Sequence, residues 1–212
     1  MQVDNHIRYY ATQPITHNMV MEALAEYQRP NDKIHQMLNQ GVLSAIRKGL
    51  YIAGPALMVN KPEPFLLANH IMGPSCISLD SALAYHQLIP ERVYQITSVT
   101  TKASRSFNTP EGLFSYTRLP LPYYSFGIQQ VSLLAQQTVM MVMPEKALCD
   151  KIITTSGIIF RSQKMAMAYL LENLRIDESS LQSFDTNIMR TWLPNAPKKD
   201  TLLMLIKTLE HL

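Results

Sequence analysis

The sequence predicts an α+β protein in two parts, a helix-rich unit over residues 1–62 and a mixed α/β unit over residues 63–212. In the first 40 positions apolar residues recur at helical spacing, whereas β-branched residues cluster in short runs from Val93 onward. Helical spacing returns at Pro144 and fills the C-terminal third. Pro62-Glu63-Pro64 marks the boundary, because two prolines in three residues interrupt regular structure.

The composition is that of a globular protein. Of 212 residues, 47% are hydrophobic and 17% charged, which excludes disordered and low-complexity chains. No apolar run approaches the roughly 20 residues of a membrane helix, and the N-terminus lacks the apolar core of a signal peptide. We therefore expect a cytoplasmic protein without a membrane partner, in which Cys76 and Cys149 stay reduced.

The first part predicts two consecutive helices. Thr16 can cap the first of them, whose apolar residues follow at helical offsets. Pro30 should interrupt the pattern, and Asn31 or Asp32 should cap a second helix that ends at Gly41. A short helix and a hairpin of two strands complete this part, at residues 4–11, 42–46 and 50–53.

Helix, turn, helix and a hairpin with a basic tip is the order of a winged helix-turn-helix, which places its second helix in the major groove of DNA. The candidate DNA-binding residues on that helix are Lys33, His35, Gln36 and Asn39, and at the hairpin tip they are Arg47 and Lys48. Six Lys or Arg against four Asp or Glu in residues 1–62 permit a phosphate partner. A helix pair with a hairpin also builds protein-interaction modules, so the pattern alone leaves both interpretations open.

The second part predicts an antiparallel-rich mixed sheet flanked by helices. Strands are expected at residues 93–99, around 107, and at 113–119, 123–128 and 138–143. Helices are expected at residues 65–72, from 78, from 144, and at 163–174, 178–192 and 201–212.

Motifs of catalysis and metal binding are absent from the sequence. It contains no phosphate-binding glycine loop, no HExxH and no pair of CxxC motifs, so we expect no enzyme, catalytic residue, cofactor or metal. Ser78 and Asp80 would lie about 200° apart on a helix, which argues against a triad with His86, and Ser78 can serve as an N-cap. Cys149 is expected to be a core thiol.

Charged residues of the second part have structural explanations. Lys146 and Asp150 can form an i,i+4 ion pair on a helix that starts at Pro144. Ion pairs of this kind usually lie on the surface and contribute little to stability. A basic cluster falls around the strands and comprises Arg92, Lys102, Arg105 and Arg118. It either faces nucleic acid or an acidic site, or is a solvated face of the sheet, which is the commoner case.

Three segments between residues 16 and 155 carry a family resemblance: residues 41–51, 77–88 (ISLDSALAYHQL) and 144–150 (PEKALCD). In this order the chain resembles the AbiEi-type antitoxins of type IV, or abortive-infection, toxin–antitoxin systems. The resemblance implies that a winged helix represses the operon's own promoter by binding repeats in double-stranded DNA. It also implies that residues 63–212 counteract a nucleotidyltransferase toxin without a stable complex. Lys102, Arg105 and Arg118 are then the candidate antitoxin surface, on a chain expected to be monomeric.

Two other functions fit the same pattern. The first is a ligand-responsive winged-helix regulator whose second domain senses a small molecule or a protein. The second is a nucleic-acid-modifying enzyme that uses the winged helix as a targeting arm, against which the missing catalytic motif counts.

Overall fold

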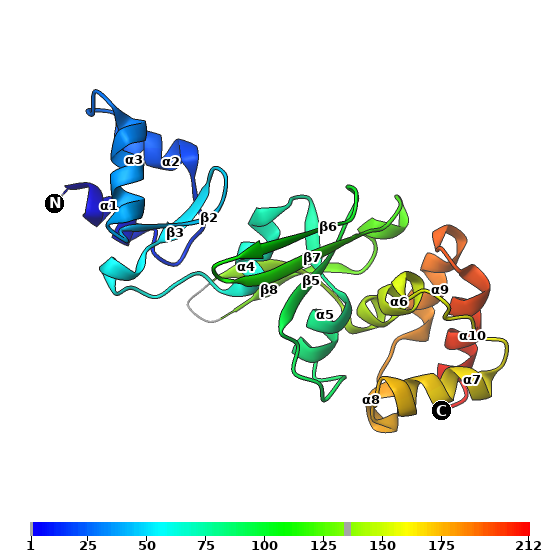
Figure 1. Cartoon of the computed structure of the whole chain (residues 1–212). Coiled ribbons are helices and arrows are strands. Elements are labelled where there is room, and N and C mark those ends of the chain that lie inside the picture. The colour runs from blue at the N-terminus through cyan, green and yellow to red at the C-terminus, as the bar shows by residue number, and fades with distance from the viewer. Residues whose placement is uncertain (1, 134–136) are drawn as a thin grey trace.

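The computed structural model of the chain describes residues 2–133 and 137–212. Its elements lie in chain order along an elongated molecule (Figure 1). The N-terminal helices occupy one end, a mixed sheet lies in the middle, and the C-terminal helices occupy the other end. The chain is therefore an α+β protein, as the sequence predicts.

The N-terminal part packs helices against a small antiparallel sheet with strand order β1-β3-β2. Its elements are α1 (Gln2–Tyr9), β1 (Ile15–Thr16), α2 (His17–Ala23), α3 (Pro30–Asn39), β2 (Leu43–Arg47) and β3 (Leu50–Ala53). Ile7, Val20 and Met37 from the helices share one apolar core with Leu43 and Tyr51 from the sheet.

Local signals set the ends of these helices. The Thr16 hydroxyl accepts a hydrogen bond from the amide of Met19 and caps α2, as predicted. Gly41, at a φ of 69°, follows α3 and turns the chain in the left-handed region, also as predicted. The predicted start of α3 at Asn31 or Asp32 is wrong. Pro30 is instead its first residue, because a proline there gives up only an N–H that has no partner inside the helix.

Strand β3 is buried on both faces. Tyr51 and Ala53 pack into the N-terminal core, whereas Leu50 and Ile52 belong to the apolar core of the larger part, together with Ile46 of β2. Alternate residues of a strand point to opposite faces, so the small sheet is covered by its own helices on one side and by the larger part on the other. The two parts therefore share a continuous apolar contact.

The larger part contains a mixed sheet with strand order β6-β7-β5-β4-β9-β8. Its strands are β4 (Ser75–Ile77), β5 (Gln95–Thr100), β6 (Arg105–Thr109), β7 (Gly112–Arg118), β8 (Ile128–Ser132) and β9 (Thr138–Val142). The β5–β7 and β4–β9 pairs are parallel and the other pairs are antiparallel. The predicted strand at 123–128 is wrong. Residues Tyr123–Ser125 form a 3₁₀ turn, because Pro120 and Pro122 before it cannot donate to a sheet.

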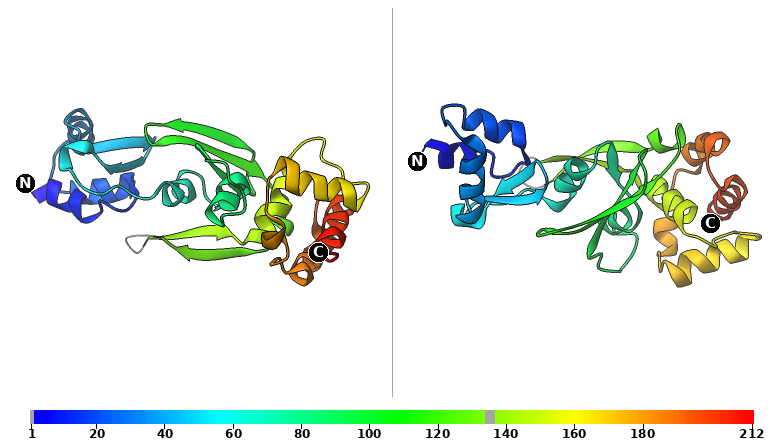
Figure 2. Two further views of the ribbon diagram at one scale, coloured as in Figure 1. Left: turned by 90° about the horizontal axis from the view of Figure 1, so that it is seen from below. Right: turned by 45° about the horizontal axis from the view of Figure 1, so that its top comes forward.

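Helices cover this sheet and extend beyond it (Figure 2). They are α4 (Pro64–Ile71), α5 (Leu79–Tyr85), α6 (Pro144–Thr154), α7 (Gln163–Ala168), α8 (Glu178–Leu181), α9 (Thr186–Trp192) and α10 (Lys199–Leu209). The helix predicted at 178–192 is two helices, because Asp185 accepts hydrogen bonds from the amides of Asn187 and Ile188 and starts α9 anew. Among the helices of the described residues, none is long and apolar enough to cross a membrane.

Candidate functional site

The outer face of α3 gathers most of the residues that the sequence predicts for DNA. Ile34 and Met37 are buried in the N-terminal core, while His35, Gln36 and Asn39 are exposed together on the opposite side. These side chains offer hydrogen-bond donors and acceptors without a net charge. The face can therefore bind the polar edges of base pairs, the chemistry that a helix in the major groove uses.

Lys33 lies at the flank of this face and is already engaged. Its ammonium donates to Oε1 of Gln36 at 3.1 Å and lies 5.7 Å from the centre of the Tyr27 ring. Asp32, which the sequence suggests as a helix cap, is instead exposed on the same side of α3, 3.9 Å from Arg29. A carboxylate repels phosphate, so Asp32 adds an unfavourable charge for an anionic ligand at the start of this helix.

The hairpin tip, with Arg47 and Lys48, is exposed at the edge of the small sheet. It lies beside the larger sheet in both views of Figure 2. Burial raises the pKa of Tyr116 on β7, and the positive charge of Arg47 acts against this rise. The tip is thus held at the junction of the two parts, and α3 lies on the N-terminal side of it.

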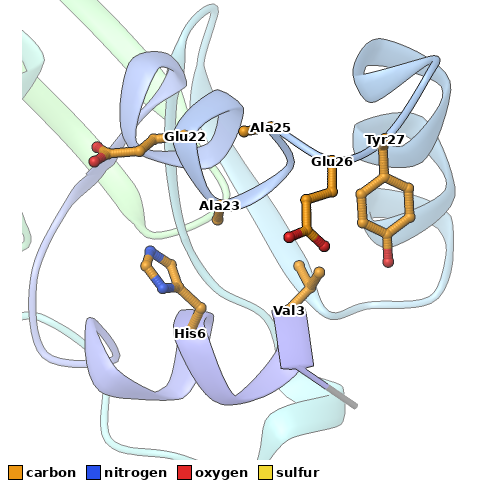
Figure 3. Close-up of a pocket in the computed structure, with 7 residues that line it drawn as sticks. All are labelled: Val3, His6, Glu22, Ala23, Ala25, Glu26 and Tyr27. Atoms are coloured by element: carbon orange, nitrogen blue, oxygen red, sulfur yellow. The ribbon is translucent and has the colours of Figure 1, made fainter.

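A cavity of about 500 Å³ opens elsewhere on the N-terminal part, between α1 and the end of α2 (Figure 3). His6, Glu22, Glu26 and Tyr27 line it, and Glu22 and His6 come from facing helices. Two carboxylates without a lysine or arginine in the lining oppose a phosphate partner. The charges of this lining therefore argue against the cavity as a phosphate-binding site.

The residues of two resemblance segments meet in the core of the larger part. Nζ of Lys146 lies 2.5 Å from Oδ1 of Asp150, and the Ser78 hydroxyl donates to Oδ2 of the same carboxylate at 2.7 Å. The Lys146 ammonium also lies 4.2 Å from the centre of the Tyr123 ring. Both charged side chains have 0% exposure. The i,i+4 pair predicted from the sequence forms, but it is buried and not a surface pair, and Ser78 bonds Asp150 in place of capping α5.

This network has the properties of a structural element. Burial raises the pKa of Asp150, while the neighbouring Lys146 ammonium and the Ser78 hydroxyl oppose the rise. Burial likewise raises the pKa of the Cys149 thiol, which keeps it protonated and unreactive. Gly127 fits closely against the network: at a φ of 61°, a Cβ added there would lie 2.8 Å from Cβ of Lys146. Residues 77–88 and 144–150 thus share a packing motif.

The predicted basic residues separate into two places. Lys102, Arg105 and Arg118 are exposed at one corner of the sheet, because Arg118 pairs in register with the last residue of β5 and Arg105 begins β6. Lys102 donates to the carbonyl of Gly73 at 2.5 Å, and Arg105 stacks over Phe107 at 5.0 Å. Arg92 does not join them. It precedes β5, and so lies at the opposite end of that strand.

Ligand and metal sites need convergent donors. Within residues 2–133 and 137–212, no group of three or more His, Cys, Asp or Glu side chains lies together in a way that could hold a metal ion. Comparison with protein-family models gave no match, and comparison with curated proteins gave none either.

Proposed function

We propose that the chain is an antitoxin and autorepressor of a type IV toxin–antitoxin operon that binds its own promoter through residues 1–62. The observation that carries the proposal is the element order of this part. A helix, a strand, two helices and a hairpin, with strand order β1-β3-β2, follow one another in the order expected of a winged helix-turn-helix, which supports the proposal. In that architecture α3 is the recognition helix and the β2–β3 hairpin is the wing.

The proposed contacts follow from the chemistry of each group. Gln36 and Asn39 present amides, which pair with base edges in the major groove, and His35 lies beside them on the same face. Arg47 and Lys48 at the wing tip contact phosphates or the adjacent minor groove. The partner is double-stranded DNA with repeats, and the chain acts in the cytoplasm without a cofactor.

Promoter binding is tested by titrating the full chain against the DNA upstream of its own reading frame. We expect a discrete complex whose affinity falls as salt increases, because phosphate contacts release counterions. Equal affinity for a shuffled duplex of the same length would contradict the autorepressor proposal.

The antitoxin activity is proposed for residues 63–212 and rests on the family resemblance together with the basic corner of the sheet. Lys102, Arg105 and Arg118 are exposed side by side there, which suits an acidic or nucleic-acid surface that the toxin also recognises. Neutralisation without a stable complex fits a surface that competes for such a target.

The test is growth of a host that expresses the neighbouring reading frame together with this chain. The full chain should restore growth, and the double variant Arg105→Glu/Arg118→Glu should not. A matched control, Lys164→Glu/Lys199→Glu, reverses two exposed charges on α7 and α10 and should restore growth as the natural chain does. Full protection by the first variant would remove the basic corner from the proposal.

One observation favours a second function, a ligand-responsive winged-helix regulator. Strand β3 is buried on both faces, so the wing is packed against the larger part. A ligand that shifts the larger part would therefore also shift the wing. If the neighbouring reading frame is harmless to the host while promoter binding persists, the regulator replaces the antitoxin.

A further inference from the structure

A second cavity, of about 450 Å³, lies in the larger part. Its walls come from the loop before β5, from the first turn of α5, from α6 and from the segment after α7. Such a volume is within the range of cavities that hold small organic ligands. The side chains used below are Asp80, Val93, Tyr94, Lys151 and Leu174, with Arg92.

One wall is an aromatic platform. Tyr94 has 81% exposure, so this large ring lies outside the core. The guanidinium of Arg92 lies 5.3 Å from the centre of the Tyr94 ring. A planar ligand can stack on such a tyrosine, and a neighbouring arginine adds a cation–π contribution.

The other wall is a polar pair. Nζ of Lys151 lies 2.7 Å from Oδ1 of Asp80, and both side chains remain partly exposed. The carboxylate keeps acceptor sites and the ammonium keeps donors, so donors and acceptors lie next to one another as they do on the edge of a nucleobase.

Charge and polarity narrow the ligand class. Asp80 pairs with Lys151 and Glu91 pairs with Arg175, so among the charged side chains of the lining Arg92 alone has no ion-pair partner within the described residues, and a polyphosphate would meet a single unpaired arginine. Val93 and Leu174 supply an apolar lining that suits a flat, uncharged ring. A neutral heteroaromatic ring with hydrogen-bond donors and acceptors on its edge fits both walls, and its transfer from water costs less free energy than that of a charged ligand.

We propose that this cavity binds a nucleobase, with its ring on Tyr94 and its edge hydrogen-bonded to Asp80 and Lys151. The base belongs either to a free nucleoside or to an unpaired position of a single strand. The site is separate from α3 and the wing, so it does not depend on promoter binding.

The test is calorimetric titration of the full chain with adenosine, guanosine, cytidine and uridine, and with a short single-stranded oligonucleotide of mixed sequence. We expect binding of at least one of these five probes. Binding of a nucleoside identifies the free ligand as the source, and binding of the oligonucleotide alone identifies the unpaired base of a strand. Absence of heat with all five overturns the proposal.

Variants of the platform test the assigned wall. Tyr94→Ala should weaken binding by about 5- to 150-fold, because stacking on an aromatic side chain is worth roughly 1–3 kcal/mol per base. Tyr94→Phe keeps the ring and should bind like the natural chain. Tyr9→Ala removes an equally exposed tyrosine, at 80%, from α1 and should leave binding unchanged.

Two outcomes here contradict the proposal: unchanged affinity of the Tyr94→Ala variant, or an equal loss with Tyr9→Ala. Since Tyr94 is exposed, thermal unfolding of Tyr94→Ala should match that of the natural chain, which separates loss of the platform from loss of the fold. The polar wall has its own variant, Lys151→Gln, which should change the order of preference among the four nucleosides. Failure of these tests leaves duplex binding by α3 untouched.

Discussion

At the scale of single residues, the buried ion pair of Lys146 and Asp150 carries a large desolvation cost. Lys146 and Asp150 both have 0% exposure, and taking two charges out of water costs several kcal/mol per ion before their attraction is counted. The arrangement persists because Asp150 has two partners, the Lys146 ammonium and the Ser78 hydroxyl. Each partner lies on a different element, so the pair ties α6 to the segment between β4 and α5.

Removal of the carboxylate should therefore be severe. Asp150→Ala leaves the Lys146 ammonium buried without its counterion, and we expect a loss of about 3–5 kcal/mol in the free energy of unfolding. Replacement of both charges, as Lys146→Met/Asp150→Leu, should cost less than the single change, because neither charge is then left buried alone. Urea unfolding followed by the fluorescence of Trp192 measures both. A single variant within about 1 kcal/mol of the natural chain would show that the pair is not buried in solution.

The two thiols lead to a prediction about reactivity. Burial raises the pKa of both Cys76 and Cys149. In the folded chain each thiol therefore stays protonated at a pH at which the thiols of the unfolded chain become thiolates. We expect almost no reaction of the folded chain with a disulfide reagent at pH 8 and rapid reaction of both thiols in denaturant. Fast labelling of the native chain would contradict the burial of these residues.

At the scale of elements, α3 and the hairpin tip should affect DNA binding differently. Gln36→Ala or Asn39→Ala should relax sequence preference, with about 1–3 kcal/mol of discrimination lost per base contact. Lys48→Ala should weaken binding to all duplexes alike and lower the slope of the salt dependence by about one. Competition titrations at several salt concentrations distinguish the two effects. Identical behaviour of the amide and lysine variants would refute the assignment of α3 as the recognition helix.

The break between α8 and α9 offers a test with a matched control. Asp185 accepts two backbone hydrogen bonds at the start of α9, so Asp185→Ala should lower the free energy of unfolding by about 1 kcal/mol. Asp177 precedes α8 in the same position, but its side chain makes no capping hydrogen bond among the described residues. Asp177→Ala should therefore have a smaller effect in the same urea titration, and the reverse order would contradict the assigned caps.

Local signals explain which elements the sequence could predict. Thr16 and Gly41 act on residues within one turn of themselves, as does Gly49, which has a φ of 78° in the turn between β2 and β3. The cap of α2, the end of α3 and the hairpin turn were therefore predictable. Long-range contacts were not. Ser78 and Asp150 are 72 positions apart, and no local pattern indicates that the hydroxyl turns to this carboxylate. The same limit applies to the candidate sites, because the position of Arg92 relative to Arg105 depends on the direction and register of β5.

At the scale of the whole molecule, the two parts are predicted by the sequence but their contact is not. Pro62-Glu63-Pro64 marks a boundary between the two parts and gives no sign of how they touch. In the structure, Lys61 pairs with Glu111 at 2.8 Å, and the amide of Glu63 donates to Gln137 at 2.8 Å, so the segment is fastened to the larger sheet. The sequence did contain one indication of this contact, because Leu50, Tyr51, Ile52 and Ala53 are all apolar. A strand that is apolar on both faces must be packed against other elements on both faces.

The two-sided burial of β3 also affects synthesis of the chain. Residues 1–62 leave the ribosome first, with Ile46, Leu50 and Ile52 exposed to water until the larger sheet has been made. During this interval the nascent chain presents an apolar sheet face of the kind that chaperones bind and that drives aggregation. A chain truncated after residue 62 would keep this apolar face exposed. The N-terminal part therefore reaches its final packing only after the larger part has been synthesised.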